Sequence, residues 1–200
     1  MMASNSKRLL AGLAFLLLAL ACHAQERKWA TLDCAYLADK SNDGDSFLVQ
    51  CGRERFFVRL YFVDAPETDL AFPDRVRQQY DYFGVGMDDL TRGGSMARDY
   101  VQRLLAPRRF AVHTRKVFAQ GRSKLTRYYG LVQVEGLYLH ELLLAEGLAR
   151  NRGTRVALPS GAKARAHANA LQAIEDRARA FRKGVWANYT PSKRVLDRPR

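Results

Sequence analysis

The sequence has 200 residues, 48% of them hydrophobic, with 33 lysine and arginine residues against 20 aspartate and glutamate residues. This length suits one domain with a hydrophobic core, and no segment after residue 24 is apolar and long enough to span a membrane, which excludes a membrane-spanning domain. The net charge of +13 favours a polyanionic partner such as nucleic acid, anionic lipid or acidic polysaccharide, without selecting one.

The first 24 residues have the pattern of a signal peptide. Two basic residues precede the apolar run 9–21, which is short for a membrane span, and residues 22–24 have the small-x-small pattern of a cleavage site. Cleavage after Ala24 would leave a net charge of +11. The sequence therefore predicts an exported protein, periplasmic or secreted. Lipid anchoring at Cys22 is the alternative that we favour less, because the usual lipobox leucine is missing three residues before it.

Two cysteines follow this segment, Cys34 and Cys51, on either side of a hairpin turn expected near Asp43-Gly44. In an oxidising compartment a single pair of cysteines is usually bonded, and two cysteines are too few for a structural zinc site. The sequence therefore predicts a Cys34–Cys51 disulfide.

Short β-type segments alternate with helical ones over residues 25–189, which we take as one domain. Runs of aromatic and β-branched residues predict five strands, at 34–38, 46–51, 55–63, 109–118 and 127–134. Apolar stripes of helical period predict three helices, at 95–105, at 138–148 and from after residue 160 to about 182. Residues 73–83 could form a short extra helix, 84–94 are expected to form a loop, and the basic tail 190–200 is expected to be disordered. Five short strands with interleaved helices indicate an α+β fold built on a small barrel or sandwich.

The stretch "VDAPET" at 63–68 places Asp64 and Glu67 directly after an apolar strand. Proline favours a turn there that can direct both side chains to one side. If Asp45 lies nearby, three carboxylates would repel one another unless a hard divalent cation or guanidinium groups neutralise them. Arg59, inside the apolar strand, could balance these acids or bind a phosphate.

These segments resemble the staphylococcal nuclease (thermonuclease-like) family. The resemblance rests on "DGDSF", "FFVRLYFVDAPET", "RYYGLVQVEG" and "AIEDRARAFRKGVW", in register over about residues 33–187. It implies a five-stranded OB-fold barrel with three packed helices. It also implies a calcium-dependent endonuclease that hydrolyses phosphodiester bonds of DNA or RNA. We further expect a monomer without a stable protein partner.

The resemblance also implies a role for each residue of the site. Asp45, Asp64 and the Ala65 carbonyl would bind calcium, with magnesium or manganese as alternatives. Glu67 would position or activate the attacking water, and Arg59 would bind the phosphate and stabilise its developing charge. These are the parts that metal-assisted phosphodiester hydrolysis requires.

Two departures from the family pattern affect the interpretation. Tyr129 occupies the place of a second family arginine, and Arg127, two residues upstream on the same strand face, is the candidate substitute in catalysis and substrate binding. Tyr129 itself could contact substrate. The segment after "PET" is also longer than usual and could cover the mouth of the site.

Two other readings remain open. The chain could be a catalytically weakened OB-fold module that binds nucleic acid or another polyanion, or an envelope protein that uses the fold for structural contacts. His113, His140 and His167 show no ligand spacing, so a metal-binding role is not expected for them.

Overall fold

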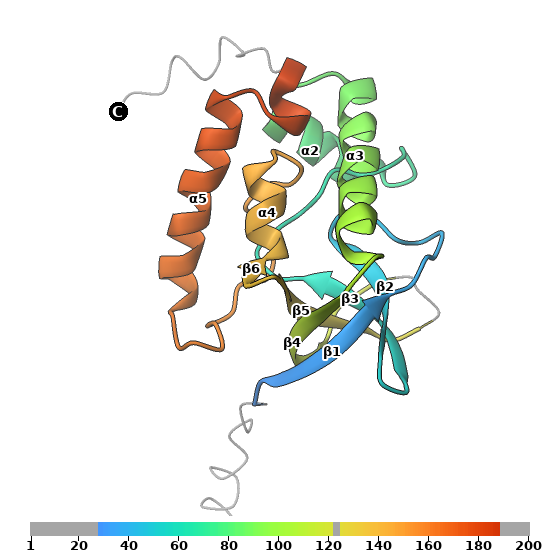
Figure 1. Cartoon of the computed structure of the whole chain (residues 1–200). Helices are drawn as coiled ribbons and strands as arrows, with labels where there is room; N and C mark the ends of the chain where they lie inside the picture. Colours follow the sequence, from blue (N-terminus) through green and yellow to red (C-terminus); the bar gives the residue numbers. More distant parts are fainter. Residues whose placement is uncertain (1–27, 122–124, 189–200) are drawn as a thin grey trace, which may run out of the picture.

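The computed structural model describes residues 28–121 and 125–188, and its strands form a closed barrel (Figure 1). The strands run in the order β3-β2-β1-β4-β5-β6, and parallel pairing of β3 with β5 closes the barrel. Their bounds are β1 (Ala30–Tyr36), β2 (Ser46–Cys51), β3 (Glu54–Leu60), β4 (Arg109–Phe118), β5 (Arg127–Val134) and β6 (Leu137–Tyr138). The five predicted strands and the α+β class are confirmed, and the two-residue β6 extends β5.

Among the described residues, four α-helices accompany the barrel and gather in the upper part of the view in Figure 1. They are α2 (Pro73–Phe83), α3 (Met87–Leu105), α4 (Leu139–Ala145) and α5 (Ala164–Ala180), and the short 3-10 helix η1 (Gly184–Asn188) follows α5. The short extra helix is therefore confirmed as α2. It ends at Gly84, which adopts the left-handed conformation that favours glycine (φ 63°).

The predicted loop at 84–94 is wrong over most of its length, because α3 begins at Met87. Its glycines suggested a break, yet they allow close packing inside the helix. A Cβ at Gly93 would lie 2.5 Å from Cγ2 of Val185, so only glycine lets α3 approach η1 this closely. This tertiary contact outweighs the low helix propensity of glycine.

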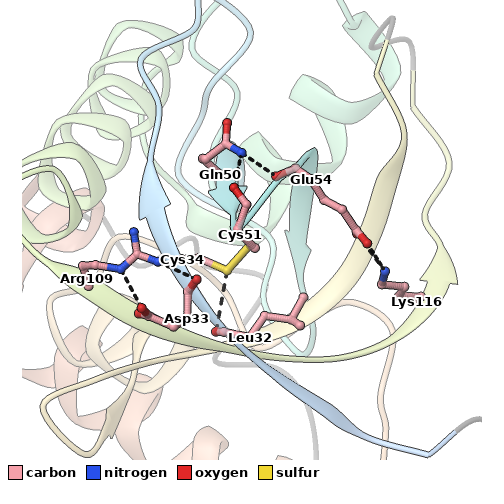
Figure 2. The surroundings of a disulfide bond; sticks show 9 residues. Leu32, Asp33, Cys34, Gln50, Cys51, Glu54, Arg109 and Lys116 are labelled. Carbon is pink, nitrogen blue, oxygen red and sulfur yellow. Dashed lines mark hydrogen bonds and ion pairs between the residues drawn. A yellow bond between two sulfur atoms is a disulfide. The ribbon is translucent and has the colours of Figure 1, made fainter.

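The predicted disulfide between Cys34 and Cys51 is present (Figure 2). The two residues face each other in the antiparallel register of β1 and β2, with their Cα atoms 4.2 Å apart. Ion pairs flank the bond, from Arg109 to Asp33 at 2.7 Å and from Lys116 to Glu54 at 2.7 Å. The disulfide therefore fixes the β1–β2 pair that leads into the turn carrying Asp45.

Two close glycine contacts hold the turn before β2 and the segment after β3 against α3. A Cβ at Gly94 would lie 2.4 Å from the carbonyl oxygen of Glu67 and 2.7 Å from that of Pro66. A Cβ at Gly44 would meet Ala97 Cβ at 2.6 Å. The helix backbone thus contacts both acidic turns, and its packing sets where those turns lie relative to the barrel.

Among the described residues, no helix has both the length and the hydrophobicity needed to span a membrane. The predicted signal peptide and the whole of the predicted tail lie outside the described residues.

Candidate nuclease site

The predicted acids and Arg59 meet at the ends of β2 and β3. Asp45 lies directly before β2, while Asp64 and Glu67 follow β3, from which Arg59 projects. The Arg59 guanidinium bridges the two aspartates, with Nη1 2.8 Å from Asp45 and Nη2 3.2 Å from Asp64. The backbone N–H of Ala65 donates to the other oxygen of Asp45 at 2.8 Å. The two aspartates are thus joined through one cation.

Two further arginines, which the sequence did not single out, also bind the acids. Arg75 of α2 lies 3.1 Å from Asp64 and 2.7 Å from Glu67, and its side chain is 44% exposed. Arg150, which follows α4 and is buried, binds Asp64 through Nε at 2.8 Å and Nη2 at 2.7 Å. Three guanidinium groups therefore balance the three carboxylates, which makes the buried charge tolerable.

Gln79 of α2 joins the same network and is fully buried. Its amide nitrogen donates to Asp64 at 3.0 Å and to the Ala65 carbonyl at 2.9 Å, and its oxygen accepts from the Glu67 N–H at 2.8 Å. The inserted segment after "PET" thus supplies Arg75 and Gln79 to the site. A polar residue on the buried face of α2, between Val76 and Phe83, was the available sequence signal for Gln79.

The electrostatics of the acids follow from burial and these cations. Burial alone would raise the pKa of Asp64, but Arg150, Arg59 and the Gln79 amide hold it below its ordinary value. Burial raises the pKa of Glu67, which Arg75 opposes only in part. Burial would lower the pKa of Arg59, yet the Asp45 carboxylate raises it above the ordinary value. Asp64 and Arg59 therefore stay charged at neutral pH, and Glu67 is a stronger base than a solvated glutamate.

A cavity of about 580 Å³ opens beside this network, and Arg59, Arg75 and Glu67 line it. Arg127 and Tyr129 line the same cavity from β5. Tyr129 pairs with Arg59 in the β3–β5 register and stacks on Tyr61, with ring centroids 5.0 Å apart.

Arg127 lies over the ring of Phe57 at 5.5 Å, and its Nη1 donates to the Gln120 carbonyl at 3.5 Å. These contacts place it on the cavity wall, in line with the interpretation that it faces the same space as Tyr129. Burial lowers the pKa of Arg127.

The oxygen donors suit a hard divalent cation in kind, since calcium, magnesium and manganese prefer carboxylate and carbonyl ligands. Asp45 forms an ion pair with Arg59 and accepts a hydrogen bond from the Ala65 N–H, whereas Asp64 accepts from arginines and from Gln79, and the Ala65 carbonyl accepts from Gln79. Among the three arginines Arg75 is the most exposed. The residues therefore fit such a cation if Arg75 moves away from Asp64 and Glu67.

A family model described as "Staphylococcal nuclease homologue" matches residues 57–188. The chain belongs to this family. Membership places it among nucleases and nucleic-acid-binding proteins, and the five-stranded barrel with its helices agrees with the family fold. The matched range contains Arg59, Asp64 and Glu67 and begins after Asp45. A search of curated proteins found no similar chain.

Proposed function

We propose that the protein is an exported, calcium-dependent nuclease that hydrolyses phosphodiester bonds of DNA or RNA. The observation that carries this proposal is the Arg59 bridge between Asp45 and Asp64 at the edge of a cavity lined by three arginines. Hydrolysis of a phosphodiester needs cationic groups that stabilise the charge of the transition state and a base that orients water. The disulfide is compatible with an oxidising compartment.

In this proposal Asp45, Asp64 and the Ala65 carbonyl hold calcium, or magnesium or manganese in its place. The ion supplies positive charge to the scissile phosphate and lowers the pKa of water. Glu67 lines the cavity and accepts a proton from the attacking water. Arg59 uses two of its nitrogens on the aspartates and keeps other N–H donors for a phosphate oxygen.

The missing family arginine leaves one phosphate contact to be supplied from elsewhere. Arg127 is the substitute expected from the sequence, and it lines the cavity from β5. Arg75 is the second candidate, because it is partly exposed in the same cavity and a bound metal ion would displace it from Asp64 towards substrate. Tyr129 occupies the position of the missing family arginine, and its ring can stack on a base of the substrate.

The direct test measures hydrolysis of single-stranded DNA with calcium and with chelator. We expect calcium-dependent cleavage by the full chain and a loss of at least about 10²-fold in the Asp64→Asn variant, because the charge that holds the metal ion is removed. Asp33→Asn is the matched control, since Asp33 is an exposed acid on β1 and should keep the wild-type rate. The Glu67→Gln variant tests the role of Glu67 as the base, and it leaves Asp64, the buried partner of Arg150, in place.

A second candidate function is a nucleic-acid-binding module with little catalysis. The replacement of an arginine by Tyr129 and the saturation of Asp64 by cations favour it. Negligible cleavage with and without calcium, by a folded protein that still binds single-stranded DNA, would select this function and reject the first.

A further inference from the structure

A second polar cluster lies where the start of α4 meets the first turn of α5, at residues that do not line the nuclease cavity. Nε2 of His140 and Nε2 of His167 are 2.7 Å apart. The Glu141 carboxylate lies 4.0 Å from Nε2 of His167, and the three ligand-type atoms all lie within 4.8 Å of one another. Two imidazoles and a carboxylate thus converge from two helices.

Aromatic rings hold both imidazoles in place. Phe62 and Tyr138 each stack on His140, with ring centroids 5.5 Å and 5.2 Å away, and Phe62 contacts His167 edge-on at 4.9 Å. His140 is fully buried, whereas the side chain of Glu141 is 32% exposed. The rings are therefore preorganised, and solvent reaches the cluster from the carboxylate side.

Burial favours the neutral form of both rings, which is the form that binds a metal ion. Burial lowers the pKa of His140 to about 3, and the neighbouring His167 acts in the same direction. Burial also lowers the pKa of His167, against the attraction of Glu141. Neutral imidazole is the ligand form, and the proton that one Nε2 donates in the 2.7 Å contact would move to Nδ1 of that ring when the ion binds.

We propose that His140, Glu141 and His167 bind one transition-metal ion, for which zinc is the best match. Nitrogen and carboxylate ligands suit zinc, with a solvent molecule in the fourth tetrahedral position. Zinc–nitrogen bonds of about 2.0–2.1 Å place tetrahedral nitrogens about 3.3 Å apart, so the two Nε2 atoms would separate by about 0.6 Å. The bound ion would crosslink α4 to α5 and stabilise their packing. This inference does not depend on the proposed nuclease function.

A simpler explanation of the 2.7 Å contact is a hydrogen bond between two neutral imidazoles, and the experiment separates the two. The full chain is stripped with chelator and titrated with zinc by calorimetry and with cobalt(II) by visible absorption. We expect one zinc equivalent, tetrahedral cobalt bands and a higher melting temperature with zinc. His167→Gln should weaken binding by at least about 10-fold.

Two matched variants make the result specific. His113→Gln changes a histidine of β4 whose ring bonds to Thr31 and Gln133, and should bind zinc like wild type. Asp64→Asn removes a nuclease-site carboxylate, and zinc binding at the histidines should persist in it whether or not it cleaves DNA. Absence of saturable zinc binding, or wild-type affinity in His167→Gln, would overturn the proposal and leave the hydrogen-bonded pair.

Discussion

The Asp64 carboxylate accepts hydrogen bonds from three arginines and from Gln79. The arginines differ in exposure, at 17% for the side chain of Arg59, 44% for that of Arg75 and 4% for that of Arg150. A buried guanidinium cannot leave its carboxylate without a large desolvation cost, whereas a partly exposed one is rehydrated as it moves. Arg150 is therefore the structural partner of Asp64, and Arg75 is the arginine that a metal ion can displace from this carboxylate.

Replacement of Arg75 by alanine separates these roles. We expect kcat/KM for single-stranded DNA to fall by about 10²-fold, because a transition-state cation is lost. Calcium affinity, measured by calorimetry, should stay the same or increase, because a cation that competes for Asp64 is removed. The control is Arg77→Ala, an exposed arginine of the same helix. An unchanged kcat/KM would rule out a catalytic role for Arg75. Weaker calcium binding in the variant would show that Arg75 positions the acids instead.

At the scale of the elements, α2 and α3 connect the acidic turn to the rest of the molecule. Gln79 of α2 bonds to the backbone on both sides of Pro66, and Gly94 of α3 brings the helix backbone against the same turn. The two helices also share a second hydrophobic cluster with α5 and η1, centred on Phe83 and Trp186. The position of Glu67 thus depends on helix packing as well as on the barrel.

The variant Gly94→Ala tests this dependence. The added methyl would collide with the Glu67 and Pro66 carbonyls, so α3 or the turn must shift. We expect the free energy of unfolding to fall by about 1–3 kcal/mol, as for other overpacked positions, with a loss of nuclease activity in the protein that remains folded. Denaturant unfolding and DNA cleavage measure the two effects. Gly86→Ala, where a Cβ would meet only Asp89 at 3.7 Å, should be nearly neutral, and equal behaviour of the two variants would contradict this account.

The whole molecule carries a net charge of +13, and part of that charge faces the cavity through Arg59, Arg75 and Arg127. Since binding of a polyanion releases counterions, the affinity for nucleic acid should depend steeply on salt. Each phosphate neutralised on a single strand contributes about −0.7 to the slope of log K against log salt.

We therefore expect single-stranded DNA binding, measured in chelator so that no cleavage occurs, to weaken linearly on a log–log plot as salt rises. Arg127→Ala should reduce the slope by about 0.7, because one phosphate contact is lost. Arg165→Ala, an exposed arginine of α5 that does not line the cavity, should leave the slope unchanged. Binding without salt dependence would contradict an electrostatic interface.

The strands, most of the helices and the first half of the site could be predicted from sequence because their signals are local, whereas the closed barrel was expected from the family resemblance. Runs of aromatic and β-branched residues marked the strands, and the acids and Arg59 stood out because charge next to an apolar strand needs a partner. The pairing of Cys34 with Cys51 followed from their number and spacing. The start of α3 was missed because Gly93 and Gly94 have low helix propensity, and only their contacts with Val185 and Glu67 explain them.

The sequence by itself determined the α+β class, the disulfide pair and the set of acids with Arg59, because each rests on near neighbours or on a simple count. The choice of a barrel over a sandwich rested on the family resemblance. Only the tertiary structure decided which cations neutralise the acids, bringing Arg75 from α2 and Arg150 from beyond α4 to Asp64. The same holds for His140 and His167, which are 27 residues apart and have no ligand spacing, yet touch through Nε2. The partners of a buried charge or ring are the side chains that helix and strand packing places beside it. These partners can be distant in the sequence, so no periodic pattern in the chain predicts them.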